Sequence, residues 1–482
     1  MKGHTKFYSA LGMLILLNVI IKPLWIFGID RQVQIVVGHE AYGRYFSLFN
    51  LSIVLSFLLD WGLTSYFNRQ LAAEQTTFIE KAGSFLLLKL VFAAIYAILV
   101  FTIAWLSGID KLGLLVSIVL IQIFTSLFVF LRSIITSHQW FRTDAWLSVL
   151  DKTLMIILAG SIIYFHKVFG QINLYRFLFT QVACTVLAVI CTLVILLRRG
   201  ISFSVADQPI LNRHLMKAAL PFAMVALLMA LHFRLDGFLL ERLHPNGAYE
   251  AGIYAAAYRL LDAANMVGYL FASFLLPYMA YQWTNKMDIQ AVILTSRHIL
   301  ILYAIFVAVT VFTLGPWLQQ LLYHNNNVDS ARVLQWCMPA LIGYSLVQVY
   351  GTVLSATGHI ATFAYINLIA VLINTILNLL LIPTYGAMAC CIAAIASQLF
   401  CGLSTMVMVN RSSGVIFQVR LWVIYVLTAT GLLLFYYELN SQSISKWLLL
   451  IAAGILTLLV TILSNYASLK AWVLSLQSFN KR

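Results

Sequence analysis

Charged side chains are scarce in this sequence. Asp, Glu, Lys and Arg together supply 10% of the 482 residues, whereas soluble globular proteins carry about 25%. Hydrophobic residues supply 62%, and long apolar runs follow one another along the chain. A chain with so few hydrated side chains cannot cover a soluble surface. The composition therefore excludes a soluble globular protein and indicates a polytopic membrane protein without a soluble domain.

Acidic residues are scarcer than basic ones. The chain has 16 Asp and Glu against 30 Lys and Arg, which gives a formal net charge of +14. Nucleic-acid-binding proteins also have a basic excess, but here the bases lie mainly in short loops between apolar runs. Membrane proteins concentrate such bases on the cytoplasmic side. The distribution argues against nucleic acid as a partner and predicts cytoplasmic termini and an even number of spans.

The sequence also lacks the groups that metals and catalysis require. No stretch between the apolar runs is long enough for a catalytic domain, and no Asp-x-Asp or Ser/His group stands at a membrane face. We therefore expect no enzyme, no catalytic residue, no metal and no cofactor. The cysteines lie in apolar runs without metal-ligand spacing, and we interpret them as small packing residues: Cys184, Cys191, Cys337, Cys390, Cys391 and Cys401.

Apolar runs long enough to cross a bilayer make up most of the chain. A spanning helix needs about 20 apolar residues, and the spans must be helical because an open sheet edge cannot lie in lipid. We predict an all-α protein with fourteen spans, at about 7–28, 43–66, 82–106, 112–136, 145–165, 174–197, 217–240, 252–281, 293–314, 332–356, 360–382, 386–409, 420–438 and 446–465.

The longest break between spans, at 198–216, predicts a cytoplasmic linker between two six-helix halves. The N-lobe is expected at 1–197 and the C-lobe at 217–410, with two further spans at 411–465. The tail at 466–482 alternates apolar and polar residues and is expected to lie on the membrane surface.

An internal repeat supports this division. The stretch from Gly43 to Leu51 opens span 2, and the stretch from Gly252 to Leu260 opens span 8 with Gly, Tyr and Leu in register. Because the two stretches lie six spans apart, the halves have the same orientation in the membrane. Such parallel repeats are typical of transporters whose substrate site lies between the halves.

The end of the first span carries an unusual charge. Lys22 lies inside an apolar run, where a basic residue costs about 2.5–3.5 kcal/mol at the bilayer centre, and Pro23 beside it predicts a kink. We expect Asp30 and Arg31 to close this helix. Two interpretations of Lys22 stay open, because the side chain either snorkels to an interface or faces a polar cavity.

Other charges also lie within predicted spans. Arg234 has Asp236 nearby, Arg259 has Asp262 one helical turn away, and Asp60 lies near the end of span 2. Structural ion pairs explain these residues as well as ligand contacts do. The bases assigned to the membrane interior are Lys22, Lys152, Arg176, Arg234 and Arg259, with Arg176 expected at an interface.

Two stretches resemble a known family. One runs from Lys22 to Arg31 and then from Gly38 to Tyr45. The other contains Ala356 to His359, three asparagines and Ile382 to Ala389. They are similar to bacterial polysaccharide-biosynthesis membrane proteins, the Wzx-type O-antigen flippases of the multidrug/oligosaccharidyl-lipid/polysaccharide exporter superfamily. The asparagines are Asn367, Asn374 and Asn378.

The resemblance implies two pseudo-symmetric six-helix lobes, as in multidrug exporters of this superfamily, with two extra C-terminal helices. It also implies alternating access in the bacterial inner membrane. The expected substrate is an undecaprenyl-pyrophosphate-linked oligosaccharide for O-antigen lipopolysaccharide, capsule or exopolysaccharide. Membrane lipids and a polysaccharide polymerase or assembly protein are the expected partners.

The resemblance assigns roles to three groups of residues. Candidates for contact with the pyrophosphate are Lys22, Arg31, Arg234 and Arg259. Candidates for binding a coupling Na⁺ or H⁺ are Asp30, Asp60, Asp236 and Asp262. Candidates for stacking on sugar rings are Trp25, Tyr45, Tyr254 and Tyr258. Aromatic residues supply 13% of the chain, so most of them pack or form interfacial belts.

Three alternatives stay open at this stage. A lipid II flippase would have the same number of spans. A drug exporter of the same superfamily would have twelve spans and an acidic cavity. A membrane polymerase or glycosyltransferase would need a catalytic loop, which this sequence lacks.

Overall fold

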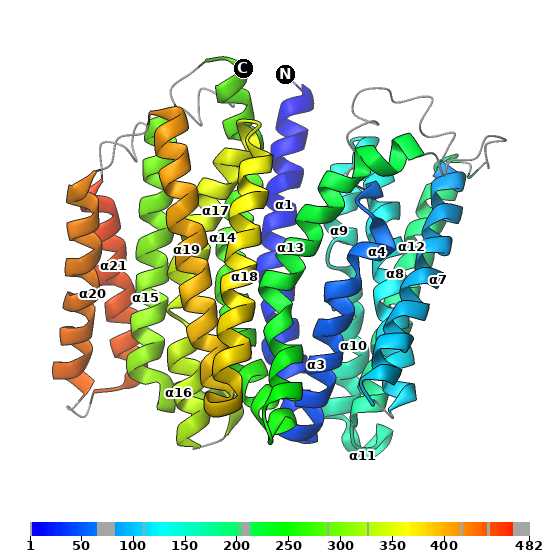
Figure 1. The fold of residues 1–482 in the computed structure, drawn as a ribbon, viewed down its shortest axis with the longest axis horizontal. Coiled ribbons are helices and arrows are strands. Elements are labelled where there is room, and N and C mark those ends of the chain that lie inside the picture. The colour runs from blue at the N-terminus through cyan, green and yellow to red at the C-terminus, as the bar shows by residue number, and fades with distance from the viewer. Residues whose placement is uncertain are drawn as a thin grey trace. The chain divides into compact units, whose positions relative to one another are not determined.

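The computed structural model describes residues 2–64, 82–108, 111–201, 203, 213–286, 289–324, 327–414, 418–440 and 444–465. Every regular element in these residues is a helix. Fourteen of the described segments are long and apolar enough to span a membrane. They correspond in order to the fourteen predicted spans, so the prediction of an all-α, multi-pass membrane protein is confirmed (Figure 1).

The chain forms two compact units, Met1–Glu241 and Arg242–Arg482. The first contains α1 (Lys2–Trp25), the π-helical turn η1 (Ile26–Asp30), α2 (Arg31–Val37), α3 (His39–Leu55), α4 (Phe57–Asp60), α7 (Ala82–Leu106), α8 (Leu112–Ser137), α9 (Phe141–Leu147), α10 (Leu150–Tyr164), α11 (His166–Phe169), α12 (Leu174–Arg198) and most of α13 (Arg213–Leu243). The second contains α14 (Gly247–Thr284), α15 (Gln290–Tyr323), α16 (Val328–Cys337), α17 (Ala340–Ala356), α18 (Ile360–Tyr385), α19 (Ala387–Ser413), α20 (Val419–Asn440) and α21 (Lys446–Ser464).

The boundary between the units falls near the end of α13, whereas the predicted linker lies at 198–216. Residues 202 and 204–212 of that linker are outside the described part of the chain, as is the predicted amphipathic tail at 466–482. The linker as a hinge, the lobe boundaries and the surface tail therefore remain predictions.

The first span continues past its predicted end. Asp30 and Arg31 do not close the helix, because α2 follows η1 directly and continues to Val37. Gly38 ends it with a φ of 80°, a conformation that glycine adopts without steric cost. The irregular turn begins three residues after Pro23, whose ring cannot donate a helical hydrogen bond. The two charges therefore lie within the helix, where π-turns often mark functional sites.

Helices α17 and α19 cross closely in the second unit. A Cβ atom on Gly343 would lie 2.5 Å from the backbone carbonyl carbon of Gln398, so only glycine permits this approach. Helices α20 and α21, the two extra spans, lie beside each other and pack on α15 (Figure 1). A large apolar core joins them to α15 and α17.

Candidate functional site

A cavity of about 280 Å³, most of whose lining residues are polar, lies between α3–α4 and α8 of the first unit. Helical spacing explains why polar residues gather there, because residues four apart share one face of a helix. Ser52, Ser56 and Asp60 follow this spacing on α3 and α4, and the Ser52 hydroxyl accepts a hydrogen bond from the Gln122 amide at 3.3 Å. The cavity is lined by Ser56, Leu59, Asp60, Thr64, Gln122, Thr125, Ser126 and Val129.

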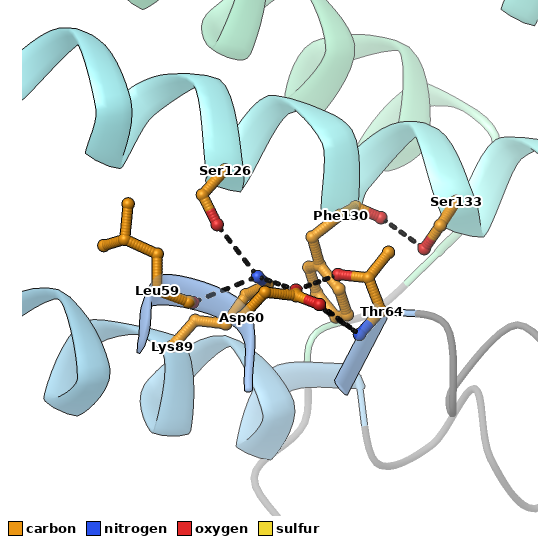
Figure 2. A network of polar contacts seen from close by, with 7 residues as sticks. All are labelled: Leu59, Asp60, Thr64, Lys89, Ser126, Phe130 and Ser133. Atoms are coloured by element: carbon orange, nitrogen blue, oxygen red, sulfur yellow. Dashed lines mark hydrogen bonds and ion pairs between the residues drawn. The ribbon is translucent and has the colours of Figure 1, made fainter. Parts of the chain in front are cut away.

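An ion pair lies at this cavity. The Lys89 ammonium is 2.5 Å from Oδ1 of Asp60, and it also donates to the Ser126 hydroxyl at 3.0 Å and to the Leu59 carbonyl at 3.4 Å. Figure 2 shows Lys89 of α7 reaching between α4 and α8 to make these bonds. The two partners differ in burial, since the Lys89 side chain is 2% exposed and the Asp60 side chain 29%. Three acceptors therefore satisfy the ammonium, while part of the carboxylate stays accessible.

A left-handed turn completes the environment of Asp60. Trp61 and Gly62 both have positive φ values, 44° and 72°, and end the helix at Asp60. The chain then turns back, so that the Thr64 amide donates to Oδ2 of Asp60 at 3.1 Å and the Thr64 hydroxyl donates to Oδ1 (Figure 2). The carboxylate thus accepts bonds from the backbone, a hydroxyl and an ammonium.

Any cation that binds at Asp60 must compete with the Lys89 ammonium. A Na⁺ ion beside Asp60 would compete with the Lys89 ammonium for the same oxygen, and the two cations would repel each other. No group of three or more metal-ligating side chains occurs in the described part of the chain.

A second cluster of charges surrounds Lys22. Its electrostatic neighbours are Lys152, Asp151 and Arg132. Lys152 pairs with Asp151 at 3.1 Å, and its ammonium lies 4.5 Å from the centre of the Trp25 ring. α1 packs against α9 and α10, which brings these residues together.

Arg132 is neutralised by a carboxylate on α9. Its Nε donates to Asp144 at 2.8 Å. The cluster around Lys22 therefore contains three bases, Lys22, Lys152 and Arg132, and two acids, Asp151 and Asp144, which leaves one positive charge in excess.

Asp30 and Arg31 have different surroundings although they are adjacent. Asp30 is fully buried and accepts a hydrogen bond from the Tyr42 hydroxyl at 2.8 Å. Arg31 is half-buried, and its Nε makes no hydrogen bond. The structure therefore places Asp30 in an internal polar contact of the first unit.

The tyrosines predicted to stack on sugars are buried. Tyr45 packs edge-to-face against Tyr42 and Phe177, and Tyr254 and Tyr258 contact each other with ring centres 5.6 Å apart. In this conformation their faces are in contact with protein, and stacking on a sugar stays a prediction.

The remaining predicted charges lie on α13 and α14. Arg234 is half-buried and Asp236 buried on α13, whereas Arg259 is buried and Asp262 half-buried on α14. All four have interaction partners within the protein. Arg176 is exposed in the first turn of α12, where it donates to the carbonyl groups of Phe169 and Gln171.

Two buried bases were missing from the predicted intramembrane set. Lys89 lies within α7 and Arg297 within α15, and both are almost fully buried. The signal was present in the sequence, because each is an isolated base inside an apolar run of spanning length.

Comparisons with known proteins agree with this architecture. A search of curated proteins finds no match. Among solved structures, the chain is similar to lipid II flippase MurJ in an inward closed conformation, with a TM-score of 0.72, 14% identity and coverage of 98% of this chain and 99% of that one. It is also similar to an outward-facing MATE family multidrug transporter of the MOP superfamily, with a TM-score of 0.61, 13% identity and coverage of 85% and 97%.

The Vibrio cholerae MATE transporter VcmN in its bent form is similar at a TM-score of 0.55 and 14% identity, with coverage of 87% of this chain and 100% of that one. These likenesses establish the fold. The sequence profile of the family described as "Polysaccharide biosynthesis protein" matches residues 11–283, which is more than half of the chain. The chain therefore belongs to the polysaccharide biosynthesis protein family, and it has the MurJ- and MATE-type fold.

Proposed function

We propose that this protein is a flippase that moves an undecaprenyl-pyrophosphate-linked oligosaccharide across the bacterial inner membrane for surface polysaccharide synthesis. Both termini are cytoplasmic, and transport proceeds by alternating access of the two lobes. A polysaccharide polymerase would receive the product. Membership of the polysaccharide biosynthesis family supports this substrate class.

The observation that carries the proposal is the excess positive charge around Lys22. A pyrophosphate that crosses a membrane must exchange water for charged or polar protein groups, and ammonium and guanidinium groups bind phosphate oxygens strongly. Lys22 makes no ion pair at 4 Å or less with a described residue, whereas its neighbours Lys152 and Arg132 are paired. We assign Lys22 as a primary pyrophosphate contact, with Arg31, Arg234 and Arg259 as further contacts.

Substitution of Lys22 tests this assignment in a strain whose surface polysaccharide depends on the protein. Lys22→Ala should reduce export at normal protein levels and leave lipid-linked repeat units on the cytoplasmic face, while Lys22→Arg should retain part of the activity. Lys167→Ala, an exposed base on α11, is the matched control and should export normally. Normal export by Lys22→Ala would show that Lys22 does not bind the pyrophosphate.

We further propose that Asp60 binds the coupling ion, H⁺ or Na⁺, which would replace Lys89 as the partner of its carboxylate. The other coupling candidates are Asp30, Asp236 and Asp262. Transport in vesicles driven by a proton gradient, with and without a sodium gradient, separates the two ions. Transport that depends on neither gradient would contradict the proposal.

Lipid II flipping is the second candidate function. It is favoured by the similarity to MurJ over nearly the full length of both chains. Complementation separates the candidates, since a lipid II flippase would rescue growth of cells depleted of their own lipid II flippase. A polysaccharide flippase would restore only the surface glycan.

A further inference from the structure

Arg297 is a guanidinium buried inside the second unit. It lies on α15, and 1% of its surface is exposed. Its Nη1 donates to the Tyr350 hydroxyl of α17 at 3.2 Å, and its Cζ lies 5.6 Å from the centre of the Trp422 ring of α20. Three helices therefore enclose one positive charge.

The guanidinium lacks a counter-charge among the described residues. It makes no ion pair there, and its Nε and Nη2 are buried without hydrogen-bond partners. The Tyr425 hydroxyl of α20 also lies beside the guanidinium and interacts with it. Since arginine keeps its charge in proteins, this buried cation has four of its five N–H donors outside the one hydrogen bond to Tyr350. Their common partner would be an anion.

The position of Arg297 along the helix indicates the source of that anion. It lies seven residues after Gln290, about 10 Å along the axis at 1.5 Å per residue. Side chains on a helix lean toward its N-terminus, so the guanidinium extends toward the end of α15. The exposed Lys286, before α15, and Arg420, at the start of α20, add positive charge to this end of the unit.

On its α20 side, the guanidinium faces the aromatic rings of Trp422 and Tyr425. Trp422 covers the cation and is itself partly exposed, and Val419 and Val423 beside it are exposed apolar residues suited to lipid contact. An indole is well placed at the depth of the lipid headgroups, where tryptophan is enriched.

We propose that Arg297, assisted by Tyr350 and Tyr425, binds the phosphate of an anionic phospholipid where α15 meets α20, after the Trp422 ring moves aside. Basic pockets between membrane helices bind anionic headgroups in this way. The two extra helices would thereby be held to the second unit through a lipid. This site is independent of the proposed transported substrate.

A purely structural role for Arg297 gives different results. If the guanidinium only holds α20 through the Trp422 ring, removing either partner would destabilise the protein equally in every lipid. If it binds a phosphate, the effect of Arg297→Gln appears only when an anionic lipid is present. Trp422→Ala would then strengthen lipid binding, because it removes the covering ring.

The test measures thermal stability of the purified full chain in detergent as phosphatidylglycerol is added, with phosphatidylcholine and inorganic phosphate as separate additions. Phosphatidylglycerol should raise the melting temperature of the native protein, and phosphatidylcholine should not. Arg297→Gln should weaken the apparent lipid affinity about ten-fold or more. Arg420→Gln removes an exposed base at the same end and is the matched control, with a change below about three-fold.

Several results would overturn the proposal. Equal stabilisation of the native protein and Arg297→Gln by phosphatidylglycerol would exclude Arg297 as the ligand. An equally large shift with inorganic phosphate would assign the site to free phosphate rather than lipid. If Arg297→Gln does not fold, Tyr425→Phe decides the matter, because it leaves the charge in place and should weaken lipid affinity only if its hydroxyl contacts the phosphate.

Discussion

The ion pair between Asp60 and Lys89 should respond asymmetrically to mutation. Asp60→Asn removes the carboxylate and leaves an ammonium that is 2% exposed, with only neutral acceptors. Lys89→Met removes the ammonium and leaves a carboxylate that is 29% exposed and still bonded to Thr64. Because water in the cavity can hydrate Asp60 but has little access to Lys89, the aspartate substitution should be the more harmful one.

The magnitude follows from the burial of the charge that remains. Leaving a buried charge without its partner costs about 3–5 kcal/mol, and we expect Asp60→Asn to approach this range. Losing a hydrogen bond to a charged group that stays hydrated costs about 1.5–3 kcal/mol, which is our expectation for Lys89→Met. The double variant should cost less than the sum of the two, since it leaves no unpaired charge.

Thermal inactivation in detergent measures this order. Membrane proteins often unfold irreversibly, so the half-life at a fixed temperature is compared for the native protein, the two single variants and the double variant. Ser117→Ala, in which the lost hydroxyl bonds only within its own helix, is the control. A half-life that is shorter for Lys89→Met than for Asp60→Asn, or strictly additive effects, would refute the reasoning from burial.

Two further predictions concern packing in the second unit. Gly343→Ala should lower the melting temperature clearly, since its Cβ would lie 2.5 Å from the backbone of α19. Gly431→Ala should be neutral or stabilising, because no atom lies within 4 Å of the Cβ that it would add. Glu250→Ala should destabilise by about 1 kcal/mol, because the carboxylate accepts the first amide of α19 at 2.9 Å. Glu250→Gln keeps an acceptor and should lose less stability than Glu250→Ala. A melting temperature of Glu250→Ala equal to that of the native protein would show that the cap is unimportant.

The fold was predictable because lipid permits few solutions. Backbone groups in hydrocarbon must be bonded within their own segment, so each long apolar run must be a helix. The end of the first span was not predictable from its charges. Asp30 has Tyr42 as an internal partner and therefore does not need to leave the helix, which continues until Gly38.

The candidate site was predictable only in part. Asp60 was identified from its charge within a span, and a salt bridge was one of its two expected roles. Its partner could not be paired with it from sequence, because Lys89 comes from another helix and the left-handed turn at Trp61 sets the direction of the carboxylate. The cluster around Lys22 likewise depends on how α1 packs against α9 and α10.

The two buried bases that sequence reasoning missed have opposite surroundings, and the difference bears on their roles. Lys89 has a carboxylate and two neutral acceptors for its three donor positions, so its charge and its hydrogen bonds are satisfied within the protein. Arg297 has five donors and one hydrogen bond, and no described carboxylate pairs with it. Burial of a charge is tolerated when it is paired and costly when it is not. Lys89 therefore needs nothing from outside the protein, whereas Arg297 gains most from an external anion.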